Sequence, residues 1–263
     1  MKKTILITLV NILLSGTLVF SQIQEKNILR NIELLGKTLY EYDQACWIAT
    51  DSLQSKNPST ALLETFSAHK ENDLWKVGFG RLEKDGEHFQ LIYEAILNSS
   101  NKQVTVVTYS PPIINTDFYF HAAKAYLAAY HEFENQSQSY NYSIIKKDDD
   151  NLYVYFYPAQ TSNVYYYLGG DIRFTFNISA NKITEKYNLH KSIIKMPYLN
   201  KGNDNAVATF SNAIITETPV ETDILYVLSR GFKSSHYVGI GDWIYIIDEN
   251  GIIKSIISRE DLN

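Results

Sequence analysis

Three polar residues near the middle of the chain are the ones whose types and spacing suggest acid–base catalysis. Asp171 begins one predicted strand, His190 lies near the end of the next, and Ser192 lies two residues beyond His190. If the strands pair so that residue numbers sum to 361, Asp171 and His190 are direct neighbours with Cβ atoms about 4.5 to 5.5 Å apart. The aspartate could then charge and orient the histidine, which could activate Ser192. The alternative, an ion pair on the hairpin surface, is favoured because such pairs are common there.

The predicted register follows from the two-residue alternation of the strands at 171–178 and 182–191. Phe174 and Phe176 lie on the apolar face, and a slip of one residue would turn both toward the polar face. Only registers in which the numbers of two paired residues add up to an odd value keep both rings on the apolar face. A tight turn at Ala180–Asn181 then selects the sum of 361.

Three consecutive tyrosines are the candidate ligand-binding residues. Tyr165, Tyr166 and Tyr167 follow a loop at 159–163, and three residues in a row on a strand cannot all face the same way. We therefore expect part of this set to be exposed. Tyrosine combines a flat apolar ring with one polar end, which suits contact with a peptide, a glycan or another protein.

A second group of tyrosines is expected to form a core face. Symmetric pairing of the strands at 140–147 and 151–158 around an acidic turn predicts Ile144 opposite Tyr155. A helix at about 116–134 carries small residues on one line, and small residues admit bulky ones from a sheet. The alternative is an open aromatic platform. The expected face consists of Tyr140, Tyr142, Ile144, Tyr153, Tyr155 and Tyr157, and its expected cover consists of Ala122, Ala125 and Ala129.

No metal or cofactor site is predicted. His131 and Glu132 begin like a zinc-protease helix, but Asn135 stands where that motif needs its second histidine. The acidic run 148–150 lacks the central glycine and distal glutamate of a calcium loop, so we expect a solvated turn. The six histidines show no ligand spacing with cysteines or acids, and the nucleophile-elbow and phosphate-loop motifs are absent.

The N-terminus resembles an export signal in its composition. Lys2 and Lys3 precede a short apolar run, and Val19 and Ser21 suit the two peptidase subsites. We expect cleavage after Ser21 and a soluble periplasmic or secreted product, with an uncleaved anchor as the alternative. The single cysteine, Cys46, lies on a predicted helix stripe, so we expect a buried thiol and no internal disulfide or lipid anchor.

Charge excludes two classes of partner. Lys2 and Lys3 are two of the 24 basic residues, so the mature chain would carry 22 against 29 acidic residues, a net charge of −7. No basic stripe remains for nucleic acid or anionic lipid. We also expect no integral membrane insertion after cleavage.

The periodicity predicts an α+β fold in which a helix followed by an antiparallel strand meander occurs twice. Apolar residues at steps of three and four predict a long helix at about 25–55 and a second helix packed on the sheet at about 116–134. Asn57 and Pro58 predict a short helix to about Phe66. Further expected elements are strands at 74–82, 88–97 and 103–109, ended by Pro111–Pro112, four strands in two hairpins between 140 and 191, a helical or extended piece at 222–229, and a hairpin turning at 248–251.

The expected organisation is a signal peptide at 1–21, a main α+β domain at 22–195 and a β-rich part at 196–263 that continues it. The sequence favours a non-enzymatic exported protein that binds a peptide, a glycan or an envelope protein through exposed aromatic residues. The alternative is a small metal-independent hydrolase that uses Asp171 and His190 as a dyad.

Overall fold

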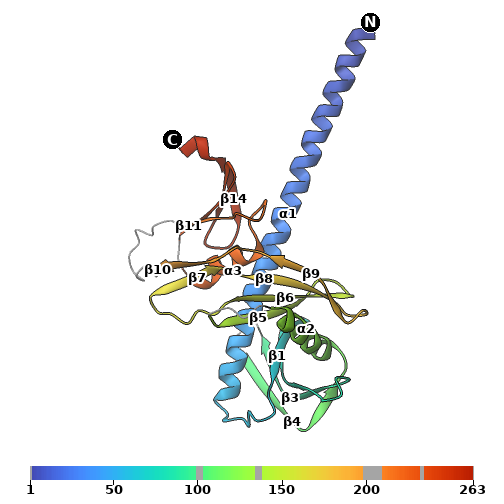
Figure 1. The fold of residues 1–263 in the computed structure, drawn as a ribbon, viewed down its shortest axis with the longest axis vertical. Coiled ribbons are helices and arrows are strands. Elements are labelled where there is room, and N and C mark those ends of the chain that lie inside the picture. The colour runs from blue at the N-terminus through green and yellow to red at the C-terminus, as the bar shows by residue number, and fades with distance from the viewer. Residues whose placement is uncertain (1, 99–102, 134–137, 198–208, 232–233, 263) are drawn as a thin grey trace. The chain divides into compact units, whose positions relative to one another are not determined.

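The computed structural model describes residues 2–98, 103–133, 138–197, 209–231 and 234–262, with side chains from residue 24 on. Its helices are α1 (Lys2–Gln54), α2 (Phe118–Glu132) and α3 (Glu221–Arg230), followed by a 3-10 helix, η1 (Arg259–Leu262). Its sheets are mostly antiparallel (Figure 1), so the predicted α+β class is confirmed. Of these described helices, none is long and apolar enough to cross a membrane.

The chain divides into two compact units. The larger unit contains residues 38–207 and 214–216, and the smaller unit contains residues 1–37, 208–213 and 217–263. Residues 38–54 of α1 therefore belong to the larger unit and the preceding part of the helix to the smaller one.

The first sheet of the larger unit is an antiparallel meander in the order β1-β2-β3-β4. The predicted helix from Pro58 to Phe66 is wrong: β1 already begins at Thr65, and turns precede it. Pro111–Pro112 does not end the third predicted strand either, because a register shift opposite Leu91 lets the strand continue past them. The strands are β1 (Thr65–Glu71), β2 (Leu74–Leu82), β3 (Phe89–Asn98) and β4 (Gln103–Asn115).

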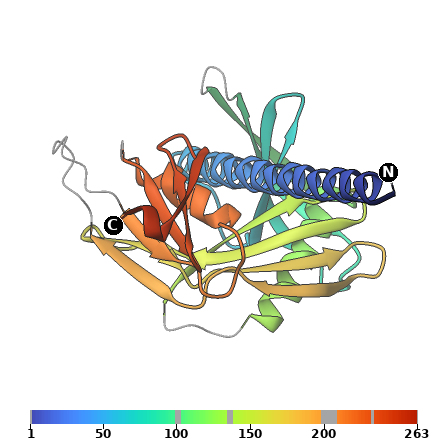
Figure 2. The same cartoon turned by 90° about the horizontal axis from the view of Figure 1, so that it is seen from above.

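The second sheet has the order β5-β6-β8-β9, and β6, β8 and β9 lie side by side in both ribbon views (Figure 2). Two further strands, which the sequence did not predict, form a separate antiparallel pair, β7 with β10. The bounds are β5 (Tyr140–Lys146), β6 (Asn151–Pro158), β7 (Tyr165–Gly169), β8 (Ile172–Asn177), β9 (Lys182–Asn188) and β10 (Ile193–Pro197).

Both four-stranded sheets of the larger unit are covered by helices. The predicted alanine line of α2 packs on the second sheet in a core with Val154, Phe156 and Phe174. On another side of α2, Tyr119 and Ala123 pack against the first sheet. The second half of α1 contacts both sheets through Asp43 and Tyr42, which meet Tyr157 and Trp75 respectively. The helices thus hold the two sheets together.

The predicted tyrosine face is wrong by one residue in register. Ile144 pairs with Val154 instead of Tyr155, so Tyr155 and Tyr157 face away from the alanine line. The cause is the acidic turn: the N–H groups of Lys147 and Asp148 both donate to the carbonyl of Asn151, which closes the turn one residue early. Tyr155 and Tyr157 are buried as expected, but Tyr153 is only partly buried, and Tyr157 contacts α1 instead of α2.

The predicted register of the β8–β9 hairpin is also wrong. Next to the turn, Asn177 pairs with Lys182, a sum of 359, and after a β-bulge Thr175 pairs with Glu185, a sum of 360. The turn is longer than predicted because Asn177 Oδ1 accepts the N–H of Ala180 and keeps four residues in the loop. The bulge then lets the apolar faces of both strands stay aligned.

The smaller unit holds a four-stranded sheet in the order β11-β12-β13-β14, in which only the β11–β12 pair is parallel. The piece predicted at 222–229 is the helix α3, and the predicted turn at 248–251 is present, with Asp248 accepting the N–H of Asn250 and Ile252. The strands are β11 (Thr209–Asn212), β12 (His236–Ile240), β13 (Trp243–Ile247) and β14 (Ile253–Ser258).

Candidate functional site

Asp171 and His190 form a buried hydrogen-bonded pair. Asp171 Oδ1 lies 2.6 Å from His190 Nδ1, and their side chains are 3% and 5% exposed. The predicted contact is therefore present although the predicted register is not. His190 lies beyond the end of β9, and the N–H of Leu189 donates to the carbonyl of Asp171 to continue the pairing. The alternative of a surface ion pair is wrong because both groups are buried.

The surroundings of this pair favour a structural role. Gly169 and Gly170 have positive φ angles of 77° and 68°, and a Cβ on Gly169 would lie 2.6 Å from the carbonyl of Ser192 and 3.1 Å from His190 Cβ. The backbone of β7 thus packs directly on the segment that carries His190. Ser192 itself is exposed, so the proposed nucleophile and the buried pair lie in different environments.

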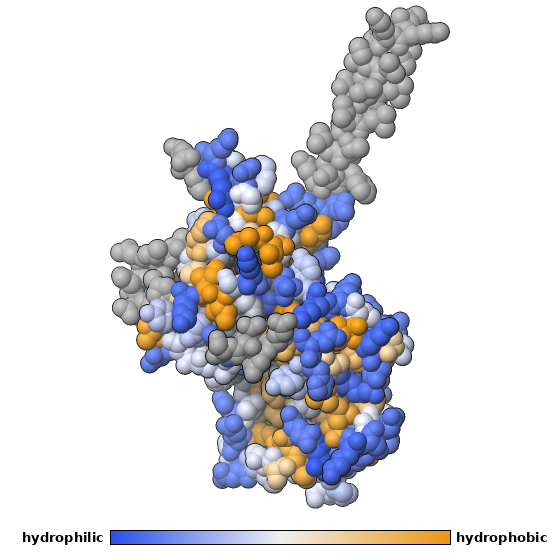
Figure 3. Space-filling model, in the orientation of Figure 1, coloured by the Kyte–Doolittle hydropathy of each residue, from blue (hydrophilic) through white to orange (hydrophobic). Residues whose placement is uncertain are grey.

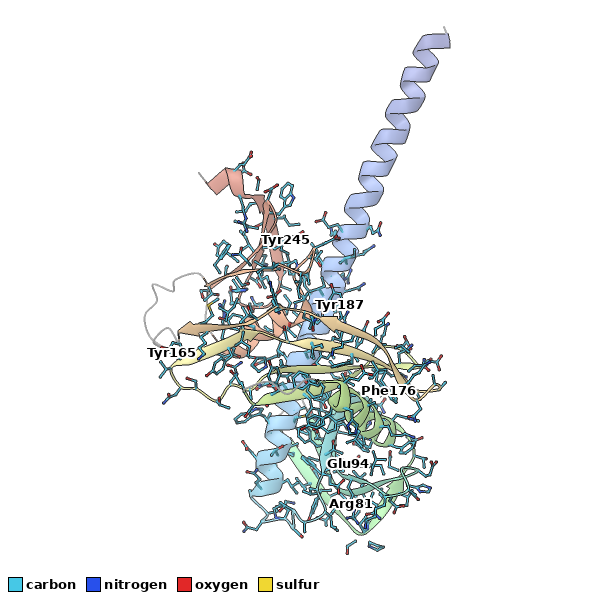
Figure 4. The ribbon with its side chains drawn as sticks, viewed as in Figure 1. Arg81, Glu94, Tyr165, Phe176, Tyr187 and Tyr245 are labelled. Atoms are coloured by element: carbon cyan, nitrogen blue, oxygen red, sulfur yellow. The ribbon has the colours of Figure 1, made fainter. Side chains whose placement is uncertain are left out.

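The three consecutive tyrosines differ in exposure. Tyr165 is 42% exposed and lies at the outer end of β7 (Figure 4), whereas Tyr166 is 5% exposed and Tyr167 is partly buried. Gln160 holds the backbone of Tyr167 through hydrogen bonds to its N–H and its carbonyl. The expected exposure is therefore found at Tyr165 and not at Tyr166.

A larger concentration of accessible aromatic residues lines a pocket of about 450 Å³ in the larger unit, here called the aromatic pocket. Hydrophobic side chains interrupt the hydrophilic surface of the molecule in Figure 3. The pocket is built from the second half of α1, the start of β1 and the start of β5. Its lining residues are Tyr42, Asp43, Cys46, Trp47, Thr50, Asp51, Gln54, Phe66, Tyr140, Asn141 and Tyr142.

One face of α1 supplies the polar rim of the aromatic pocket. Asp43, Trp47, Asp51 and Gln54 follow one another at steps of four, four and three, which places them on one side of a helix. Trp47 is 62% exposed, the highest value among the exposed aromatic residues described. This helical spacing is visible in the sequence, but it does not show that the face meets Phe66 and Tyr142 of the two sheets.

The floor of the aromatic pocket is held rigidly. The rings of Phe66 and Tyr142 lie 5.0 Å apart. The Tyr142 hydroxyl accepts the N–H of Phe66 at 3.1 Å and donates to its carbonyl at 2.9 Å. This one hydroxyl satisfies both backbone groups of Phe66 at the edge of the first sheet, and burial raises the pKa of Tyr142. The two rings are therefore fixed before any ligand arrives.

Asp43 is the acidic group that lies deepest in the aromatic pocket. Burial raises the pKa of its carboxyl, and the hydroxyl of Tyr157, which donates to Asp43 Oδ1 at 3.1 Å, partly offsets that shift. Tyr157 also contacts the hydroxyl of Ser143 at 2.8 Å. Cys46 is buried as predicted, and burial raises the pKa of its thiol, so the neutral thiol packs as a small apolar group.

One group of side chains in the described residues has the proximity of metal ligands. Ligand atoms of Glu83, Asp85 and His88 lie within 4.8 Å of one another in the turn between β2 and β3. The sequence showed no ligand spacing around the histidines, whereas in the structure His88 Nδ1 lies 3.6 Å from Glu83 and 3.7 Å from Asp85. The group is partly exposed, and Gln90 donates to Glu83 Oε1 at 2.6 Å, so ordinary ion pairs and hydrogen bonds account for it.

The two motifs that the sequence analysis rejected as metal sites lie in a turn and in a helix. The run 148–150 is a solvated turn in which Asp148 Oδ1 accepts the N–H of Asp150, as expected. His131 lies in the last turn of α2, and Asn135 lies outside the described residues. Comparison of the chain with protein-family models, with curated proteins and with solved structures finds no match.

Proposed function

We propose that this is an exported, non-enzymatic binding protein whose aromatic pocket takes a sugar ring of a glycan. The observation that carries the proposal is the exposed indole of Trp47 above a pocket with a rigid aromatic floor. A sugar ring has an apolar C–H face that packs on a flat aromatic side chain. Its hydroxyls both donate and accept, and Asp51, Gln54 and Asn141 at the rim offer both functions.

The pocket fits a glycan better than a peptide. A peptide that adds a strand needs free N–H and C=O groups on a sheet edge. At this place the Tyr142 hydroxyl already occupies both groups of Phe66. The pocket volume of about 450 Å³ also suits a small ligand. An envelope protein would instead need a broad, flat contact surface.

Replacing Trp47 by alanine should weaken glycan binding about tenfold or more, because the ring contributes most of the apolar contact. The measurement is a screen of the purified protein on immobilised glycans, followed by titration calorimetry with the best ligand. The matched control is Trp243→Ala, which removes another exposed tryptophan, 53% exposed and located in the smaller unit, and should leave affinity unchanged.

Two results would contradict the glycan proposal. The first is that Trp47→Ala and Trp243→Ala bind the selected glycan equally well. The second is that no glycan binds while a peptide library yields a ligand whose affinity depends on Trp47, which would assign the pocket to a peptide.

Export supports this function because glycans of envelopes and extracellular matrices lie outside the cytoplasm. We propose export because Lys2 and Lys3 precede an apolar run, as in a signal peptide, with cleavage after Ser21. The protein released by an expressing bacterium should have the mass of a chain that starts at Gln22. An intact Met1 in the membrane fraction would show an uncleaved anchor instead.

The hydrolase alternative has less support. Its dyad, Asp171 and His190, is present but buried, and its third candidate, Ser192, is exposed. A catalytic histidine must reach the proton that it transfers, in a site that also admits the substrate. The burial of the pair therefore favours the binding function over hydrolysis.

A further inference from the structure

A second and larger cavity of the larger unit, of about 800 Å³, surrounds the edge of β1 and is called here the Glu94 cavity. We propose that it binds a small organic cation, an amine joined to an apolar body, with Glu94 as the counter-ion. This site is separate in chemistry from the aromatic pocket, although Tyr42 lies in the wall of both. Figure 4 labels Glu94 on β3, in the sheet below α2.

The position of Glu94 is fixed by two tyrosines. Tyr119 of α2 donates its hydroxyl to Glu94 Oε1 at 2.9 Å, and Tyr109 of β4 donates to Oε2 at 3.1 Å. Gly78 lies opposite Glu94 in the sheet, and a Cβ there would lie 2.6 Å from the Tyr119 ring. The missing side chain at Gly78 therefore makes the space in which Tyr119 reaches Glu94. A carboxylate has about four lone-pair sites, so two acceptor positions remain for a ligand.

The lysines around the cavity already have anionic partners. Lys70 pairs with Glu41 at 2.9 Å, and Lys146 pairs with Asp149 at 2.7 Å. A third lysine, Lys76, pairs with the neighbouring Glu71. Each of these cations is therefore neutralised by its own neighbour.

Glu94 differs from those acids. Within the described part of the chain, no lysine, arginine or histidine forms an ion pair with Glu94 or with Asp117, the other such acid in the lining. Asp117 is exposed and precedes the first turn of α2, where the helix dipole stabilises it. Among the described residues, Glu94 accepts hydrogen bonds from tyrosine hydroxyls only, and Lys76, which acts on it through charge, is ion-paired with Glu71. Glu94 is therefore the carboxylate that a ligand cation would neutralise.

The histidines of the cavity do not supply the missing positive charge at neutral pH. Burial, and next the charge of Lys76, lower the pKa of His69. Burial and Lys124 lower the pKa of His121 in the same way. Both imidazoles are therefore mainly neutral at pH 7, and an external cation meets no competing charge from them.

Aromatic rings complete the site. The His69 ring lies 4.8 Å from the ring of Phe118 and 5.2 Å from that of Tyr119. Phenyl and phenol faces attract cations and also receive apolar groups. Aliphatic residues, among them Ile144 and Leu152, line the same cavity. An amine with a hydrocarbon body would thus find a charge partner and an apolar surface together.

Two other ligand classes fit less well. An anion would have to displace the acidic partners of the lysines and would face Glu94 itself. A metal ion needs several ligand atoms close together, and the one such group among the described side chains is the hairpin group around His88. An amine requires one carboxylate and a ring, which the cavity provides.

The experiment compares amines with alcohols of the same shape. Calorimetric titrations of the wild-type protein with benzylamine and benzyl alcohol, and with butylamine and butanol, should show at least tenfold tighter binding of each amine. Glu94→Gln keeps the shape, and its amide can accept from one tyrosine hydroxyl and donate to the other, but it removes the charge, so it should abolish that preference. The control variant is Glu87→Gln, an exposed carboxylate of the β2–β3 turn outside this cavity. Equal binding of amine and alcohol to the wild type would overturn the proposal.

A second variant, Phe118→Leu, tests the same proposal if the Glu94→Gln protein does not fold. Phe118→Leu keeps the charge of Glu94 and most of the apolar volume but removes an aromatic face. It should lower the affinity for benzylamine several-fold more than that for benzyl alcohol. An unchanged ratio in Phe118→Leu, or in a folded Glu94→Gln protein, would overturn the assignment.

Discussion

A His190→Ala variant is expected to lose about 3 to 5 kcal/mol of its free energy of unfolding. The imidazole Nδ1 lies 2.6 Å from Asp171 Oδ1, and both side chains are almost fully buried. Removal of the ring would leave the carboxylate buried without this partner and would open a void next to Gly169. The measurement is equilibrium unfolding in urea, followed by circular dichroism.

The control for this variant is Ser192→Ala, which removes an exposed hydroxyl two residues away and should change stability by about 0.5 kcal/mol or less. The double variant Asp171→Asn with His190→Ala should recover part of the loss, because the buried charge is gone. A His190→Ala protein with the wild-type unfolding midpoint would contradict the structural role. The hydrolase alternative makes a different prediction, namely a stable protein that loses activity in both His190→Ala and Ser192→Ala.

The contact between Asp171 and His190 shows what sequence patterns can predict and what they cannot. The sequence predicted that the two side chains would meet, and their hydrogen bond confirms that contact. Alternation cannot detect the bulge at Thr175 or the loop that Asn177 stabilises, so the register was wrong by one or two residues. Burial was missed because the cover comes from β7, a strand that the pattern did not show.

The two proposed sites were beyond sequence reasoning for a different reason. The long helix was predicted from its apolar stripe, and the strands β2 and β3 from alternation and turn residues. The aromatic pocket needs Trp47 to lie near Tyr142, and the Glu94 cavity needs Glu94 to lie under Tyr119. These pairs are far apart in sequence, and each depends on packing between a helix and a sheet. Local periodicity predicts which residues share a face of a helix or strand, but it does not predict which other element packs against that face.

Gly78 illustrates this limit. In the sequence it stands within an apolar strand pattern, where a glycine only weakens the prediction of a strand. In the structure its missing side chain is the condition for the ring of Tyr119 to reach Glu94. The role of such a residue becomes visible only when the partner from another element is known.

The second large effect is expected at Tyr155, which is completely buried on β6. Tyr155→Ala should cost about 3 to 5 kcal/mol in the free energy of unfolding, as the deletion of a large buried ring does. The control is Tyr187→Ala on β9, whose ring is 44% exposed and should contribute about 1 kcal/mol or less. Denaturant unfolding of both variants, monitored by circular dichroism, measures the difference, and equal losses would show that burial does not set the cost.

The same variant also tests on which face of the second sheet the ring lies. The register with Ile144 opposite Val154 turns Tyr155 away from α2, whereas the core under the helix contains Ala125, Val154 and Phe174. Tyr155→Ala and Ala125→Gly should therefore have additive effects, to within about 0.5 kcal/mol. Had the sequence-based register been correct, Tyr155 would lie under Ala125 and the double variant would deviate from additivity by more than that amount. A strong coupling would show that the Tyr155 ring packs against α2 and that the sequence-based register of the β5–β6 hairpin is correct.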